Sequence, residues 1–453
     1  MTTADSATPG PARTDPERAD ARRSGEIPVG DVLRSGSVTP FLIAVFLATI
    51  GLAAETTALG KQVFDLTRRE LDLGLLGLAE FAPSALLVIV AGGVADRFDR
   101  RRIFSGALVG EAACAMGLAA LVWADAVNLS RILMIVVVFG VFRAFAAPSS
   151  RSLPVNLVEP VLLPRLIALN SVAWQSALIV GPIVAGGLYV LSPAAPHVFA
   201  ASCALAAAAI ALTIRYAPSY VRPPRAAPGS TNVRSAFEGI VVIRRNPILL
   251  GAISLDLFAV LLGGAVALLP AIADERLGVG AVGLGWLRAA GGMGAAAAAA
   301  VFTFRPLRRR VGPTLFVVVA IFGAATIGLG LTTNYVVALA MLFIMSAADS
   351  VSVFIRSTLG PLVTPDAVRG RVVAVESVFI GASNELGAFE SGLAGALIGA
   401  AGAIVFGGAA TLVVAAVWCV AFPALRRIDR FEELTPARVD HVDSTDGDST
   451  SVG

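Results

Sequence analysis

The chain has 453 residues, of which 56% are hydrophobic and 15% charged, and its mean hydropathy is +0.80. Soluble domains are about 45–50% apolar and about 25% charged, so this composition excludes an ordinary soluble protein and indicates a membrane protein. The formal net charge of +3 is small, and the arginines are scattered among turns, which argues against nucleic-acid binding.

The ionisable and sulfur-containing residues also limit the chemistry. The three cysteines lie inside apolar runs without paired spacing, and His197 and His441 are the only histidines. These counts argue against a disulfide framework, a metal site and a histidine-based catalytic centre. Lys61, the only lysine, is not part of a G-x4-G-K-[ST] phosphate-binding loop. We therefore expect a protein that is not an enzyme and that needs no metal and no cofactor.

The two ends of the chain differ from its middle. Residues 1–37 and 428–453 are polar, and we expect both to be disordered tails. Between them the chain carries about twelve apolar segments of the roughly 20 residues that a helix needs to cross a bilayer. In chain order these segments are 39–62, 72–95, 103–124, 130–152, 164–191, 196–216, 246–273, 280–303, 312–332, 334–361, 371–398 and 401–426.

A polar stretch at 217–245, which ends in a short amphipathic piece, separates six of these segments from the other six. We therefore predict an N-terminal bundle at 38–216, a linker at 217–245 and a C-terminal bundle at 246–427. Arginines gather in alternate turns, and positive charge marks the cytoplasmic side. By this rule the tails and the linker are cytoplasmic, and the protein is a multi-pass protein of the plasma (inner) membrane.

The two predicted bundles echo each other in sequence. The turn "GGVADRFDRRRI" at 92–103 matches "AVFTFRPLRRRV" at 300–311, an offset of 300 − 92 = 208. The segment "RSLPVNLVEP" at 151–160 matches "RSTLGPLVTP" at 356–365, an offset of 356 − 151 = 205. Parallel six-helix repeats are typical of transporters whose substrate site lies near mid-membrane between the repeats.

The first of these turns resembles the cytoplasmic signature of the major facilitator superfamily, G-x-x-x-D-R-x-G-R-[RK]-[RK], although Asp99 replaces a glycine. The matching residues are Gly92, Asp96, Arg97, Arg100, Arg101 and Arg102. The resemblance covers about 39–426 and is closest to the branch of enterobactin exporters and drug exporters. The stretches "VIRRNPILLGAISLDLF", "GLGWLRAAGGMGA" and "RGRVVAVESVFIGASNELGAFESG" carry it. It implies an all-α membrane fold of twelve helices in two six-helix pseudo-repeats, and we expect a monomer.

In this family the signature turn latches the two halves together on the cytoplasmic side. The resemblance implies that Asp96 accepts hydrogen bonds from the N-terminal amides of the eleventh helix, near Arg369 and Arg371. A carboxylate in that position also complements the helix dipole. The alternative is a pure topology signal, which would explain the arginines of the turn but not Asp96.

Several charges lie inside the apolar segments, where each costs about 2.5–3.5 kcal/mol at a helix centre. Glu55, Glu80 and Glu385 are our candidates for proton coupling, because burial can bring the proton exchange of a carboxyl group close to neutral pH. For Glu55 and Glu80 the alternative is a wet acid near the membrane surface. Arg143 resembles the family's helix 4 arginine, which is implicated in proton coupling. Its alternative role is that of a structural counter-ion for Glu55 or Glu111.

The remaining intramembrane charges are Glu111, Asp256, Arg288 and Asp349. For the three acids among them we favour pairing between helices or a position at a helix interface, and Arg288 receives no assigned role.

The fifth segment carries a pattern that resembles the exporter motif G-x8-G-x3-G-P-x2-G-G. Gly181, Pro182 and Gly186 match it, and alanines replace its other three glycines. The match favours antiport and hence export. The alternative is ordinary packing of helices through small residues.

These observations predict a secondary active transporter that exports an amphipathic small molecule, such as a drug or a siderophore, in exchange for protons. Its partners would be the substrate, protons and the lipid bilayer. A proton symporter for nutrient uptake and a non-transporting membrane sensor or scaffold remain as alternatives.

Overall fold

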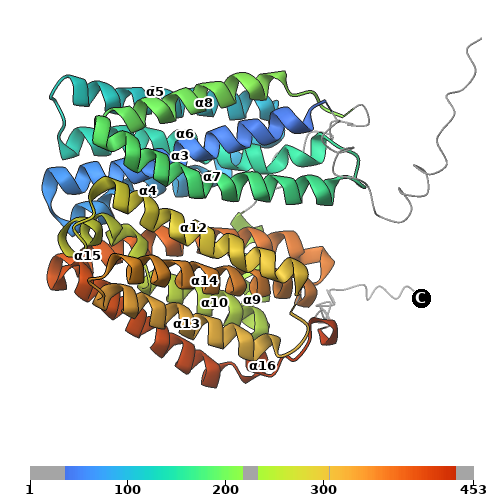
Figure 1. The fold of residues 1–453 in the computed structure, drawn as a ribbon. Coiled ribbons are helices and arrows are strands. Elements are labelled where there is room, and N and C mark those ends of the chain that lie inside the picture. Colours follow the sequence, from blue (N-terminus) through green and yellow to red (C-terminus); the bar gives the residue numbers. More distant parts are fainter. Residues whose placement is uncertain (1–35, 218–232, 306, 435–453) are drawn as a thin grey trace, which may run out of the picture.

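The computed structural model describes residues 36–217, 233–305 and 307–434, and every regular element within these ranges is a helix (Figure 1). The expected tails up to residue 35 and from residue 435, and most of the linker, lie outside the described residues. Among the described residues, ten helices are long and apolar enough to cross a membrane. One of these ten, Asp366–Ala421, consists of two helices that meet at Gly399. With these counted separately and with the 28-residue helix α4 (Glu70–Arg97) added, the described residues contain twelve long helices. The predicted all-α membrane fold is confirmed.

Figure 1 shows the helices in two stacked groups. The first group consists of α3 (Val38–Thr67), α4, α5 (Arg100–Trp123), α6 (Leu129–Ser152), η1 (Pro154–Asn156), α7 (Leu163–Leu191) and α8 (Ala195–Thr213). The second group consists of α9 (Val233–Arg245), α10 (Pro247–Leu262), η2 (Ala265–Leu268), α11 (Leu269–Ala271), η3 (Ile272–Arg276), α12 (Gly280–Phe304), α13 (Val311–Leu331), α14 (Tyr335–Val363), α15 (Asp366–Ala421), α16 (Pro423–Arg426) and η4 (Phe431–Glu433). We call them the N-group and the C-group.

Local signals in the sequence set several helix starts. The side chains of Asn128, Asn246 and Asn334 accept hydrogen bonds from backbone amides in the first turns of α6, α10 and α14. Such N-caps satisfy amides that have no partner within the helix. Gly399 separates the two spans of α15 with φ 76° and ψ 157°, a conformation that only glycine adopts easily. This junction coincides with the expected short turn between segments 371–398 and 401–426.

One expected helix is broken in the structure. The segment 246–273 was predicted to be continuous, but α10 ends at Leu262, and a 3-10 turn, a short α-helix and a π-helix follow. Gly263 and Gly264 stand at the break, where side chains would collide with neighbouring helices. A Cβ atom on Gly264 would lie 2.5 Å from the Gly387 carbonyl oxygen. The glycine pair therefore permits both the break and the close contact with α15.

We call the two ends of the bundle the tail end, where the described chain begins and ends, and the far end, which lies opposite. The tail end carries residues 36 and 434 together with the turns at 98–99 and 153–162, and the far end carries the turns at 68–69 and 277–279 (Figure 1). Residues 428–434 were expected to begin a polar tail. They pack on the C-group instead, with Ile428 buried and Asp429 accepting a hydrogen bond from the Arg310 amide. The apolar side chains of Ile428, Phe431 and Leu434 explain this difference.

Helix α9 matches the amphipathic piece expected at the end of the linker, and it packs against α15. Its Ile243 is buried with Val363 and Val372 of the C-group. The two groups meet mainly along two helix pairs, α7 with α12 and α4 with α15. These pairs frame the space between the groups.

Candidate functional site

Close packing joins the two groups toward the far end. A Cβ atom on Gly186 of α7 would lie 2.5 Å from the Ala281 carbonyl oxygen, and one on Gly285 of α12 would lie 2.4 Å from that of Pro182. Only residues without side chains allow helices to cross at this distance. Gly186 and Pro182 of the predicted exporter motif therefore lie at the crossing between the groups. The third motif residue, Gly181, packs within the N-group, where a Cβ atom would lie 2.7 Å from that of Ala53.

The second helix pair opens along its length. A Cβ atom on Gly74, near the far end of α4, would lie 3.1 Å from Phe389 of α15. Farther along the pair, one on Gly381 of α15 would still lie 3.7 Å from Phe81 of α4. At Gly92 and Gly93, close to the tail end, an added Cβ atom would meet nothing within 4 Å. The contact between α4 and α15 is thus tight at the far end and absent at these two glycines.

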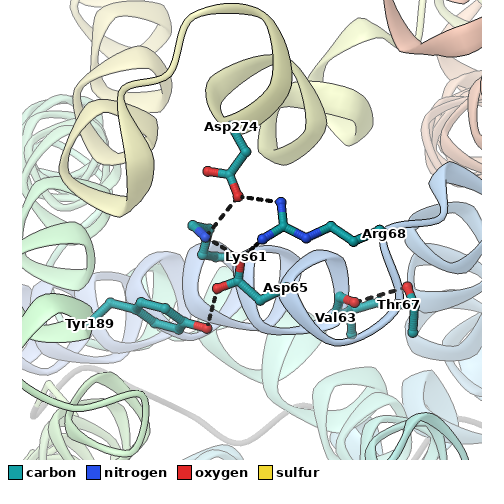
Figure 2. A network of polar contacts seen from close by, with 7 residues as sticks. All are labelled: Lys61, Val63, Asp65, Thr67, Arg68, Tyr189 and Asp274. Atoms are coloured by element: carbon teal, nitrogen blue, oxygen red, sulfur yellow. Dashed lines mark hydrogen bonds and ion pairs between the residues drawn. The ribbon is translucent and has the colours of Figure 1, made fainter.

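A network of charges crosses between the groups at the far end (Figure 2). Lys61 Nζ lies 3.0 Å from Asp274 Oδ2 of η3, and Arg68 Nη1 lies 3.3 Å from the same oxygen. Lys61 also pairs with Asp65 one turn along α3. The Tyr189 hydroxyl donates a hydrogen bond of 2.9 Å to Asp65 Oδ2 and so links α7 to the network. Asp274 is the C-group residue that both Lys61 of α3 and Arg68, directly after α3, contact.

A cavity of about 350 Å³ lies between the two groups, and residues of both groups line it. Its polar lining consists of Thr56, Glu80, Arg288, Ser346, Asp349, Asn384 and Glu385. The end of α10 and the break that follows it line the cavity as well, through Val260, Gly263, Gly264, Val266 and Ala267. Broken helices near mid-membrane are a common way to build a substrate site, because they offer backbone groups to a ligand. The cavity therefore combines space, charge and irregular backbone.

Two of the predicted proton-coupling residues belong to this cavity, and a third pairs with one of them. Glu80 of α4 and Glu385 of α15 both line it. Arg143 of α6 lies 2.9 Å from Glu80 Oε1 as an ion pair, although this nitrogen does not meet hydrogen-bond geometry. Arg143 thus forms an ion pair with Glu80, a partner not expected from the sequence. The side chain of Glu80 is 17% exposed and faces the cavity, so it is no near-surface acid.

Other ionisable groups of the cavity form no hydrogen bond or close ion pair among the described residues. No hydrogen bond or ion pair within the described chain reaches Glu385 or Asp349. Arg288 Nε is buried without a hydrogen-bond partner. Arg288 and Glu385 both reach toward the N-group. A Cβ atom added to Gly60 of α3 would lie 3.5 Å from Arg288 Nη2, and one added to Gly77 of α4 would lie 3.4 Å from Glu385 Oε2. Asp256, by contrast, pairs with Arg356 between α10 and α14, as its expected role in helix pairing requires.

Glu55 lies elsewhere. It is 1% exposed and is held inside the N-group by His197, whose Nδ1 is 2.9 Å from Glu55 Oε1. The other ring nitrogen, Nε2, is 3.1 Å from Gln62 Oε1. Glu55 is therefore neither a wet acid near the surface nor part of the cavity lining. Spacing could have indicated this cluster, because Glu55 and Gln62 are two helical turns apart and share one face of α3.

The described contacts of the signature turn stay within the N-group. The side chain of Asp96 lies outside the described residues, and Asp99 is the centre of the turn. Asp99 caps α5 by accepting from the Arg101 amide at 3.0 Å, and it also accepts from the Tyr216 hydroxyl at 2.7 Å. The hydrogen bond from the Arg101 side chain holds the pKa of Asp99 below its ordinary value. Burial raises the pKa of Tyr216 to about 12.

The expected partner of the turn also bonds within its own group. Arg369, at the start of α15, pairs with Asp366 and donates a hydrogen bond of 3.2 Å to the Pro361 carbonyl. Both contacts lie in the C-group. The position of Asp99, which replaces the signature glycine, is explained by its role as the N-cap of α5.

Two groups of membrane-spanning helices around a charged central cavity define a membrane transporter. Residues 41–388 match the family model of the Major Facilitator Superfamily, and the chain belongs to this family of transporters. It is therefore a transporter and not an enzyme.

The chain is also 27% identical over 275 residues to an uncharacterized MFS-type transporter, y4rN, of Sinorhizobium fredii (strain NBRC 101917 / NGR234). That match covers 58% of this chain and spans 66% of the relative's length.

Solved structures share the fold. A bacterial homologue of the human lysosomal transporter Spinster, in an inward-facing and occupied conformation, aligns with a TM-score of 0.65 and 16% identity, over 87% of this chain and 96% of that one. The nucleoside transporter NupG aligns with a TM-score of 0.61 and 13% identity, over 87% of this chain and 100% of that one. At these identities the likeness concerns the fold alone.

Proposed function

We propose that this protein is a proton-driven exporter of an amphipathic small molecule, such as a drug or a siderophore, and that it works by alternating access. The observation that carries the proposal is the cavity between the groups, which holds ionisable side chains from both of them. The exporter-like pattern of α7 supports antiport, and the sequence resemblance supports the enterobactin and drug exporter branch.

Proton coupling would use the carboxyl groups of the cavity. Glu80 and Glu385 line the cavity from two helices that pack against each other, α4 and α15, and a carboxyl group can take up and release a proton as the cavity changes its exposure. Arg143 would respond to the charge of Glu80, its ion-pair partner. The membrane potential adds about 2.3 kcal/mol per charge for each 100 mV. Glu55, held by His197 inside the N-group, would instead tie α8 to α3.

The orientation follows from the arginines. Arginines are frequent in the tail-end turns and scarce in the far-end turns, so the tail end would face the cytoplasm of a cell whose plasma membrane holds the protein. The structure, tightly packed at the far end, would then be the state open to the cytoplasm. In the opposite state the far-end network would separate, and the signature turn with Asp96 would close the tail end.

The test is proton movement in inside-out vesicles that contain the protein. The vesicles are energised, and a pH-sensitive dye reports proton release while lipophilic cations, antibiotics and siderophores are added in turn. We expect a response to some compounds that is lost in the Glu80→Gln, Glu385→Gln double variant. Glu159→Gln, which changes an exposed glutamate in a tail-end turn, is the matched control and should respond like the unchanged protein.

Two other results would contradict the proposal. Energised uptake into whole cells, lost in the double variant, would indicate a nutrient symporter. Silence across the panel, with protein that is folded and abundant, would indicate a sensor or a scaffold.

A further inference from the structure

We infer that the ligand of the central cavity carries an anionic group, a carboxylate, phosphate or sulfonate, that binds the guanidinium group of Arg288. The inference deepens the proposed function, because it takes the cavity to be the substrate site. It names the class of substrate: a small amphipathic organic anion.

The surroundings of Arg288 motivate the inference. Arg288 projects from α12 into the cavity, and its Nε is buried without a hydrogen-bond partner. No carboxylate of the described residues lies within ion-pair distance of it. The one cavity acid that has a close counter-ion, Glu80, is paired with Arg143. Glu80 is also near enough to interact electrostatically with Arg288, but no described residue forms an ion pair or a hydrogen bond with the Arg288 guanidinium group.

The carboxyl groups of the cavity and the guanidinium group of Arg288 differ in whether they can lose their charge, and this difference indicates the charge of the ligand. The carboxyl groups of Asp349 and Glu385 can become neutral by taking up a proton, whereas a guanidinium group keeps its charge in proteins. A permanent charge inside a membrane protein requires a counter-charge or strong hydrogen bonds. The planar fork of guanidinium donors fits two oxygens of a carboxylate, phosphate or sulfonate at once. The permanent feature of the cavity is thus a site for an anion.

The rest of the wall indicates the other end of the ligand. Leu73, Leu76, Val260, Phe322 and Met345 also line the cavity and offer an apolar surface. A volume of about 350 Å³ lies in the range of small-molecule sites. A ligand that combines a ring system with one anionic group matches both parts of the wall. Proton exchange and anion binding then use different groups, the carboxyl groups and Arg288.

The test uses three compounds that share one skeleton and differ in charge: 2-naphthoate, 2-naphthamide and 2-naphthylmethylammonium. Binding of each to the purified protein in detergent is measured by isothermal titration calorimetry. We expect 2-naphthoate to bind at least about tenfold more tightly than the other two, as a charge-assisted hydrogen bond implies. Equal or tighter binding of the amide or the ammonium compound, or binding of none of the three, would overturn the inference.

Variants assign the effect to the residue. Arg288→Gln should remove the preference for 2-naphthoate, and Arg288→Lys, which keeps the charge but loses the fork, should weaken binding by about tenfold. Arg309→Gln changes an exposed arginine at the tail end and should bind 2-naphthoate like the unchanged protein. Size-exclusion profiles and thermal unfolding show whether each variant folds. If Arg288→Gln does not fold, the affinity of Arg288→Lys for 2-naphthoate tests the inference. An unchanged preference in a folded variant overturns the inference.

Flux into proteoliposomes separates this inference from the proposed function. Binding of 2-naphthoate that depends on Arg288, without movement of any compound, would leave the inference intact and contradict transport. Movement of cations that survives Arg288→Gln would support transport and overturn the inference.

Discussion

The two ends of the interface between the helix groups differ in what holds them. At the far end, one carboxylate of the C-group, Asp274, is shared by two cations of the N-group, and glycines bring α7 and α12 together. At the tail end, the described contacts of Arg101 and Arg369 remain within their own groups. The tail end is rich in arginines and the far end is not, so the density of charge does not tell where a transporter is held closed. The two groups are held together where a charged side chain of one group forms an ion pair with a side chain of the other group.

The largest effect should come from removing the shared carboxylate. Asp274→Asn takes the counter-charge from Lys61 and Arg68, while Asp65 remains beside Lys61. Hydrogen bonds to charged groups contribute about 1.5–3 kcal/mol, and about 1.4 kcal/mol corresponds to a tenfold change in population. We expect the variant to shift the equilibrium toward a state that is open at the far end.

Distances between spin labels check this shift. Labels at Asp125→Cys and Thr333→Cys report on the far end, and labels at Glu159→Cys and Arg308→Cys report on the tail end, in a protein whose native cysteines are replaced. With Asp274→Asn the first distance should lengthen and the second shorten. Asp429→Asn is the matched control, because it breaks an exposed ion pair with Arg309 inside the C-group. Distances that stay unchanged in Asp274→Asn would mean that the network does not hold the far end.

The next effect concerns the close crossing of α7 and α12. Gly186→Val would place a side chain against the Ala281 carbonyl oxygen, and overpacking of this kind costs about 1–3 kcal/mol. We expect lower thermal stability and a longer far-end distance. The neighbouring Gly187→Val meets nothing within 4 Å and should leave both measurements nearly unchanged. Equal behaviour of the two variants would show that the crossing does not depend on Gly186.

A smaller effect is expected at the N-cap of the tail-end turn. Asp99→Asn keeps an oxygen that can cap α5 but removes the charge that pairs with the Arg101 side chain and accepts from Tyr216, and a partly exposed ion pair contributes about 0–1 kcal/mol. Because the bonds are internal to the N-group, the spin-label distances should not change. A changed tail-end distance would show that Asp99 also acts between the groups.

The stability loss of Asp99→Asn should also depend on pH. The pKa of Asp99 is lower in the folded protein than its ordinary value near 4, so its charged form stabilises the fold above that ordinary value. This contribution is present in full at neutral pH and declines as the pH falls below about 4 toward the folded pKa. Chemical unfolding at pH 7 and at pH 3.5 should therefore show a smaller difference between variant and unchanged protein at the lower pH. A difference that grows on acidification would contradict the assignment.

The smallest effect on stability belongs to the glycine of the signature turn. Gly92→Ala meets open space in this state and should raise stability by about 0.5–1 kcal/mol through helix propensity. If the tail end closes at Gly92 in the opposite state, transport should nevertheless fall. Gly106→Ala also meets open space and should gain stability without losing transport. Full transport activity in Gly92→Ala would falsify a close approach at this position.

Sequence patterns predicted the helices well and the partners of their side chains poorly. Each apolar run defines its own helix, so α6 and α12 begin and end within one residue of the expected segments. The break at Gly263 was missed because its cause is the close approach of α15, which hydropathy does not report. The ion pair of Arg143 with Glu80 was missed for the same reason, since Glu80 comes near Arg143 only when α4 packs on α6.

The candidate site shows the same limit. Intramembrane position identified Glu80 and Glu385 as candidates, and both line the cavity. The same criterion selected Glu55, which lies outside the cavity lining and contacts His197 inside the N-group. Arg288 received no role because position within a helix does not show whether a charge lacks a partner. That property depends on the neighbouring helices.

The far-end network contains the only lysine of the chain. Lys61 is thus the one side-chain amine of the protein, and 10% of its side chain is exposed while it bonds to Asp274. The molecule carries a natural chemical reporter at the contact between its groups. Reductive methylation with carbon-13 would give a single dimethyl-lysine resonance whose chemical shift follows the making and breaking of this contact. Impermeant acylating reagents, applied from one side of the membrane and read by mass spectrometry, would count how often the contact opens in living cells.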